Sequence, residues 1–117
     1  MPTIRDLVAA IRRRDGVDAA VVLGRDGLLI DHQADAGLDA ESIAAHVPSI
    51  LVHADELAVA AGQGHLYTAV HEHAAGTAVI AAMSPDAVLL VLLRPTADLG
   101  ALLFDLRRHR ANIAALA

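Results

Sequence analysis

The sequence predicts an α+β fold, in which one five-stranded antiparallel sheet carries helices on both faces. Segments with helical apolar spacing stand at both ends and in the middle of the 117-residue chain. Five strand-like segments lie between them, and two of these are apolar on both faces. Very short connections join several of the strands, which forces antiparallel pairing. The expected order is α-β-β-α-β-β-β-α.

A first helix is expected over residues 3–14. Thr3 is a candidate N-cap, and Asp6, three residues later, completes a weak capping box. The pair Asp15-Gly16 then ends the helix, because glycine favours the conformation that follows a helix C-terminus.

Residues 18–32 are expected to form a β-hairpin. The run from Ala19 to Leu23 is apolar at every position, which indicates a central strand covered on both sides. The sequence Arg25-Asp26-Gly27 is typical of a turn, since glycine tolerates a positive φ. Residues 28–30 form the returning strand.

After a polar loop over residues 33–38, a second helix is expected over residues 39–61, with Asp39 as its N-cap. Pro48 interrupts this helix, because proline lacks the N–H group and clashes with the preceding turn. We expect either a kink or a break that places Pro48 in the first turn of a new helix. The helix is expected to bury one apolar stripe. The stripe consists of Ile43, Val47, Ile50, Ala54, Leu57 and Ala61, with Leu51 and Ala58 at its edge.

Three strands are expected next, over about 65–74, 77–83 and 87–93. The connections between them are so short that consecutive strands must pair antiparallel. The last strand is apolar throughout and is therefore expected at the centre of the sheet. A final helix is expected over residues 97–115, with its leucines on the buried side.

The composition narrows the possible functions. The chain contains neither Lys nor Cys, which excludes a P-loop lysine, a Schiff base, a disulfide and a thiol nucleophile. Its formal net charge is −5, and Tyr67 and Phe104 are its only aromatic residues, so nucleic-acid binding is not expected. We expect a single domain over residues 1–117, a cytoplasmic location, no targeting segment and no stable membrane insertion.

Four segments carry a resemblance to a known family. They are GVDAAVVLGRDGLLI at residues 16–30, the Ala-rich helix that ends at Gly62, the three-strand meander up to Leu93, and LGALLFDLRRHRANI near the end. Together they resemble the roadblock / dynein light chain family, and within it the bacterial MglB-like proteins. The resemblance implies a profilin-like sandwich. It also implies a protein that binds Ras-like small GTPases, forms homodimers or heterodimers, and acts as a scaffold or a GTPase-activating partner.

The second helix carries apolar residues beyond its buried stripe. Ala45, Val52 and Val59 recur every seven residues on the opposite side, where a monomer leaves them exposed. The resembled family dimerises through this helix, so we interpret the three residues as part of a partner interface. The alternative is scattered surface Ala and Val in an Ala-rich chain.

Histidines are concentrated in the strand expected over residues 65–74. His65, Tyr67, His71 and His73 are expected to share one strand face. We interpret them as part of a dimer seam at an edge strand. One alternative is an ordinary polar sheet face. Another is a metal site in which His71 and His73 meet two imidazoles of a two-fold partner. No bound metal is expected.

The remaining polar residues have ordinary interpretations. The arginines within residues 12–14 and 107–110 are read as helix-terminal cations, with a basic patch as the alternative. None of the three serines stands in a G-x-S-x-G motif, which disfavours a hydrolase. Arg25 at the hairpin tip could serve as an arginine finger, but nothing distinguishes it from the other arginines.

The first functional hypothesis is a non-enzymatic, homodimeric regulator of a Ras-like small GTPase. It would act on the GTP form as an activator or an effector partner. The alternatives are a passive scaffold that joins other proteins and a small-ligand sensor domain. No cofactor is expected. The chain has no nucleotide-binding motif of its own, which fits a partner of a GTPase better than a GTPase.

Overall fold

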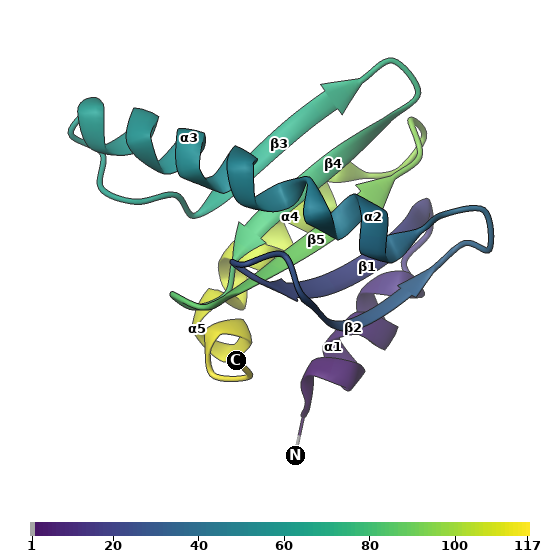
Figure 1. Ribbon diagram of the computed structural model, residues 1–117. Helices are drawn as coiled ribbons and strands as arrows, with labels where there is room; N and C mark the ends of the chain where they lie inside the picture. Colours follow the sequence, from purple (N-terminus) through teal and green to yellow (C-terminus); the bar gives the residue numbers. More distant parts are fainter. Residues whose placement is uncertain (1) are drawn as a thin grey trace.

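Five antiparallel strands form one sheet, in the order β2-β1-β5-β4-β3. The computed structural model describes residues 2–117 (Figure 1). The predicted α+β class is confirmed. The elements are α1 (Ile4–Arg12), β1 (Val17–Gly24), β2 (Leu29–Ala34), α2 (Ala40–Ala45), α3 (Val47–Ala60), β3 (Thr68–His73), β4 (Gly76–Ala82), β5 (Ala87–Leu93), α4 (Leu99–Arg108) and α5 (Arg110–Ala114).

Helices cover both faces of the sheet (Figure 1). α1 and α4 pack against one face, and α2 and α3 pack against the other. The side chains of β1 alternate between the two apolar layers. Ala20 and Val22 lie in the first layer, and Val21 and Leu23 lie in the second. This alternation explains why the strand predicted to be central is apolar at every position, and the same holds for β5.

Side-chain caps begin the helices where the sequence predicts them. The Asp6 N–H donates to the Thr3 hydroxyl at 3.2 Å, and the Thr3 N–H donates to the Asp6 carboxylate at 2.9 Å. These two bonds complete the capping box of α1. At the start of α2, the Ser42 N–H donates to the Asp39 carboxylate at 3.2 Å. The carboxylates of Asp6 and Asp39 therefore serve the backbone at helix N-termini, which otherwise lacks acceptors.

The predicted second helix is divided at His46, and Pro48 lies in the first turn of α3. This is the second of the two outcomes expected of Pro48, since the first turn of a helix needs no N–H from it. The break brings α3 against the β1–β2 turn. A Cβ on Gly27 would lie 3.2 Å from Pro48 Cγ, and the φ of Gly27 is +92°. Both the contact and the backbone conformation therefore favour glycine there.

The expectation of one continuous final helix is wrong. α4 ends at Arg108, the backbone of His109 leaves the helical range (φ −103°, ψ 16°), and α5 begins at Arg110. The helical spacing misses this break because no proline or glycine marks it. In the resulting arrangement the guanidinium carbon of Arg110 lies 4.2 Å from the centre of the Tyr67 ring, a cation–π contact.

β3 begins at Thr68, later than the predicted start of this strand at residue 65. The Leu66 N–H donates to the Asp55 carboxylate of α3 at 2.8 Å. The chain before Tyr67 is therefore bonded to α3 and does not pair with β4. At the residue just before β3, the Tyr67 carbonyl accepts a hydrogen bond from the Ala82 N–H at 2.9 Å. Within the described chain β3 pairs only with β4, so its other edge is open.

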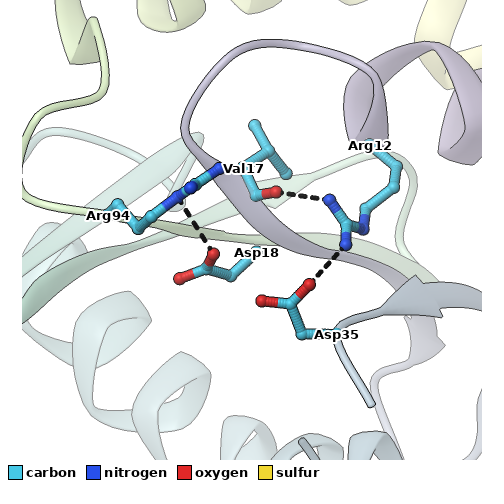
Figure 2. A network of polar contacts seen from close by, with 5 residues as sticks. All are labelled: Arg12, Val17, Asp18, Asp35 and Arg94. Carbon is cyan, nitrogen blue, oxygen red and sulfur yellow. Dashed lines mark hydrogen bonds and ion pairs between the residues drawn. The ribbon is translucent and has the colours of Figure 1, made fainter. Parts of the chain in front are cut away.

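Arg12 joins three parts of the chain (Figure 2). Its Nη1 donates to the Val17 carbonyl at 2.6 Å, and its Nη2 pairs with Asp35 at 2.7 Å. Beside it, Arg94 Nε pairs with Asp18 at 3.2 Å. These contacts fix the end of α1 against the start of β1 and the chain just after β2. They lie where the pairing of β1 with β5 shifts its register.

The cations near the end of α1 are largely used within the fold. Arg12 pairs with Asp35, and Arg14 Nη1 pairs with Asp105 of α4 at 2.7 Å. Two of the three arginines in residues 12–14 therefore have carboxylate partners. Arg13, Arg107, Arg108 and Arg110 have no ion pair among the described residues, so a basic patch remains the alternative interpretation.

Replacing Arg12 by Gln should lower the free energy of unfolding by about 1–2 kcal/mol, because the change removes a charge-assisted hydrogen bond and a half-buried ion pair. Arg13→Gln is the matched control, since Arg13 is exposed and has no ion pair among the described residues. Its effect should stay within about 0.5 kcal/mol. Urea unfolding measures both variants, and equal effects would contradict the structural role of Arg12.

Candidate partner interface

α3 exposes three large apolar side chains. Val52 is 54% exposed, Leu57 72% and Val59 66%. Only Val47 and Leu51 of this helix are buried. A helix that packs on one face of a domain ordinarily carries polar residues on its other side. Val52 and Val59 lie on one side of α3, and Leu57 lies about 140–160° around the helix from them. These three exposed residues, here named the α3 apolar surface, therefore indicate regions that a partner covers.

The predicted strip of Ala45, Val52 and Val59 is exposed at all three positions. The break at His46 places Ala45 on α2 and the other two residues on α3. The strip is therefore carried by two consecutive helices and not by one. Its role as an interface stays a prediction.

The expected buried stripe is wrong at its C-terminal end. The spacing predicts that Leu57 and Ala61 are buried, but both are exposed. Leu51, expected at the edge of the stripe, is only 1% exposed. The reason is geometric, because the C-terminal turns of α3 project beyond the strands (Figure 1). Helical spacing identifies the side of a helix that faces a sheet, but not the point at which the sheet ends.

The open edge strand β3 places Ala69, His71 and His73 on the sheet face that α3 covers. Ala69 packs with the α2–α3 core, and alternation along the strand puts the two histidines on the same side. Their ring centroids are 6.1 Å apart. His71 is half-buried and His73 is exposed. This part of the predicted histidine arrangement therefore lies beside the unpaired edge of the sheet.

A groove of about 420 Å³ runs between α3 and β3. The α3 residues that line it include Ile50, His53 and Leu57, and His71 lines it from β3. The ring Nδ1 of His53 lies 2.8 Å from the Ser49 carbonyl of its own helix. Because Leu57 and His71 border the same groove, the Leu57 side of α3 and the open edge of β3 form one continuous area. Val52 and Val59 lie on the opposite side of the helix and do not line this groove.

His65 and Tyr67 do not share a strand face with His71 and His73, contrary to the prediction. They precede β3, and their rings meet edge to face with centroids 5.5 Å apart. Both instead line a second cavity, at the other end of the β3 segment. The cause is the hydrogen bond from the Leu66 N–H to the α3 side chain described above, which takes this stretch out of the strand.

Arg25, at the tip of the β1–β2 hairpin, is held by α3. Its Nη1 pairs with Asp55 Oδ2 at 3.0 Å, and both side chains are half-buried. Asp55 Oδ1 accepts the Leu66 N–H. That backbone hydrogen bond and then the Arg25 guanidinium lower the pKa of Asp55 below its ordinary value of 3.8. An arginine held in this way must break an ion pair before it can reach into a partner's active site.

Asp55 was not among the candidate site residues, and no motif in the sequence marks it. It stands next to Glu56 and two residues after His53, so a carboxylate there resembles any solvent-facing residue of an amphipathic helix. Only the folded arrangement brings it to both Arg25 and the Leu66 backbone.

The helical stretch Ala40–Ala60 has 21 residues and a mean hydropathy of 1.2, enough by length and composition alone to cross a membrane. Only 17% of its most apolar window is buried. The stretch is divided at His46 and contains Asp55, which pairs with Arg25. The residues of the α3 apolar surface contribute to this high mean hydropathy. The expected lack of membrane insertion stays a prediction.

Within residues 2–117, no group of three or more His, Asp or Glu side chains could hold a metal ion. Among the described residues, His71 and His73 are a pair of neighbouring rings, with centroids 6.1 Å apart. Four-coordinate structural zinc sites need more ligands than this pair supplies.

Comparison with known families identifies the chain. The family model for the Roadblock/LC7 domain matches residues 3–93. The chain belongs to the Roadblock/LC7 family. The match includes all five strands of the sheet together with α1, α2 and α3. A search of the curated proteins found no match.

Solved structures of MglB proteins share this roadblock fold. The gliding protein MglB from Thermus thermophilus superposes with a TM-score of 0.83 at 19% identity, over 97% of this chain and 87% of that one. An MglB with a tetrameric arrangement gives 0.83 at 20% identity, over 97% and 86%. MglB from Myxococcus xanthus gives 0.81 at 16% identity, over 92% and 81%. At these identities the likeness establishes the fold.

Replacing Asp55 by Asn in this roadblock domain should lower the free energy of unfolding by about 1 kcal/mol at pH 7, because charge-assisted hydrogen bonds to Arg25 and Leu66 are weakened. The lowered pKa of Asp55 means that its stabilisation is complete above pH 3.8 and is lost as the pH falls through its folded-state pKa. The difference between the wild type and this variant should therefore shrink in acid.

The matched control is Glu56→Gln, because Glu56 is the adjacent carboxylate, is exposed and has no ion pair in the described part of the chain. Its effect should be small at every pH. Denaturant unfolding between pH 7 and pH 3 measures both variants. A constant difference between Asp55→Asn and the wild type over that range would show that the carboxylate charge is not responsible.

Proposed function

We propose that this roadblock domain is a non-enzymatic, homodimeric regulator of a Ras-like small GTPase, and that it binds the GTP form. The observation that carries the proposal is the set of exposed apolar residues on α3, of which Leu57 adjoins an open strand edge. The class of partner comes from the family, because the resemblance to roadblock proteins implies dimer formation and binding of Ras-like GTPases.

A two-fold dimer would cover both features at once. In an isologous interface the same patch lies on both subunits. The α3 apolar surface would then pack against its own symmetry mate, and the open edge of β3 would pair with the same edge of the second copy. The groove between Leu57 and His71 joins the Leu57 side of α3 to the open edge of β3. The MglB with a tetrameric arrangement is an example of assembly in a protein of this fold.

Such a dimer would act on a GTPase through contacts and not through chemistry of its own. The chain has no lysine and so no P-loop of the usual kind. The ion pair of Arg25 with Asp55 favours a surface contact over an inserted arginine. The switch regions of a GTPase are ordered by the γ-phosphate, so a regulator must distinguish the two nucleotide states there. Equal affinity for both states would shift no equilibrium.

The double change Val52→Asp with Val59→Asp should produce a folded monomer. Burying unpaired carboxylates in a self-complementary apolar interface is costly, so dimerisation should weaken at least about a hundredfold. Leu28→Asp is the matched control, because Leu28 is an equally exposed apolar residue of the β1–β2 turn. Light scattering measures the mass of each. A wild-type protein that is monomeric at tens of micromolar would exclude the homodimer.

The protein should bind a Ras-like small GTPase from the same genome at least about tenfold more tightly when the GTPase is loaded with a non-hydrolysable GTP analogue than with GDP. Titration by calorimetry measures both affinities, and the Val52→Asp, Val59→Asp variant tests whether the dimer surface is involved. Equal affinities for the two forms would support the passive scaffold in place of the regulator. Single-turnover GTP hydrolysis then separates an activator from an effector.

A further inference from the structure

A second cavity, of about 700 Å³, lies apart from the groove beside β3. It is bounded by the β1–β2 hairpin tip, the C-terminal half of α3, the chain before β3, the β4–β5 turn and α5. Small-molecule sites in proteins commonly have volumes of about 300–1,000 Å³, so this one has room for a compact organic molecule. Neither the proposed dimer nor the proposed GTPase contact uses it.

Two guanidinium groups line the cavity, and the structure neutralises only one of them. Arg25 pairs with Asp55, while its Nε is buried without an acceptor among the described residues. A buried donor without a partner is uncommon and calls for an explanation. Arg110 stacks on the Tyr67 ring and, within residues 2–117, has no carboxylate partner. The formal charges of Arg25, Arg110 and Asp55 sum to one excess positive charge, in a chain whose formal net charge is −5.

The other walls of the cavity are mainly apolar, and they include Tyr67, Met83 and Pro85. Ser84 adds a polar group: its Oγ accepts the Asp86 and Ala87 N–H groups at 3.2 and 3.1 Å. Both bonds use the hydroxyl oxygen as the acceptor, so its proton remains available to a ligand. The cavity therefore combines an apolar body with a few polar groups, which is the usual arrangement of a small-molecule site.

We propose that this cavity binds a small organic acid, whose carboxylate pairs with Arg110 and Arg25 and whose apolar body packs against Tyr67 and Met83. A planar carboxylate matches the fork of N–H donors on a guanidinium. One carboxylate also balances the single excess positive charge, whereas a phosphate dianion would overcompensate it. The apolar walls favour a hydrocarbon body over a sugar or a nucleotide.

Binding at this site would bridge α5 and the β1–β2 hairpin tip. Arg110 lies on the short α5, which follows the break at His109, and Arg25 lies at a hairpin tip. A ligand that contacts both arginines, with Tyr67 between α3 and β3, would hold these segments together. Because such a ligand binds only the folded state, it should raise the melting temperature as its concentration increases.

The experiment uses the full chain and three probes: sodium octanoate, octanamide and inorganic phosphate. Titrations followed by amide NMR should show saturable octanoate binding, with shifts centred on Tyr67, Ser84 and Ala114.

The Arg110→Gln variant should weaken octanoate binding at least about tenfold. Arg107→Gln is the matched control, since Arg107 is an exposed arginine on α4 that does not line the cavity, and it should change the affinity less than about twofold. Octanamide, which is neutral, should bind at least about tenfold more weakly than octanoate.

Circular dichroism establishes that each variant is folded, and Arg110→Gln is decisive because Arg110 has no ion pair to lose among the described residues. Arg25→Gln, which also removes the pair with Asp55, serves as a second variant and should likewise weaken binding. The proposal is overturned if octanoate does not saturate, if its shifts centre on the α3 apolar surface, or if Arg107→Gln weakens binding as much as Arg110→Gln. Phosphate binding as tight as octanoate binding would also overturn it, because the apolar walls would then have no role. None of these outcomes depends on a GTPase.

Discussion

The arrangement of this domain depends on how Asp55 holds the second half of α3. Val47 and Leu51 bury the first half of the helix against the sheet, but the later turns project past the strands. There the Asp55 carboxylate binds both the Arg25 guanidinium and the Leu66 N–H. This one side chain therefore connects the β1–β2 hairpin, α3 and the chain that enters β3. It fixes the orientation in which α3 shows its apolar residues beside the sheet edge.

That orientation separates two surfaces with different chemistry. On one side, Leu57 and His71 border a groove beside an unpaired strand, which suits self-association. On the other side, Arg25, Tyr67 and Arg110 enclose a cavity with excess positive charge, which suits a small anion. A roadblock domain of this form can therefore present one surface to other proteins and keep a separate cavity for a ligand.

Patterns that depend on neighbouring residues were predictable from the sequence. The caps at Thr3 and Asp39, the break caused by Pro48, and the central strands that are apolar on both faces all follow from local chemistry. The family could also be recognised, since three of the four segments that resemble it lie within the matched residues 3–93. Contacts distant in sequence were not predictable. The bond from Leu66 to Asp55 removed His65 and Tyr67 from the expected strand face, and the exposure of Leu57 depends on where the sheet ends.

The most direct test of the interface is the distance between two copies of α3. The chain contains no cysteine, so a single Val59→Cys change allows one spin label per protomer without background. Phe104→Cys, on α4 across the sheet, provides an exposed reference position. If two α3 helices meet at a two-fold axis, pulsed dipolar spectroscopy should give a well-defined distance at position 59 that is shorter than the distance at position 104. No dipolar coupling at position 59, or a shorter distance at position 104, would contradict the interface.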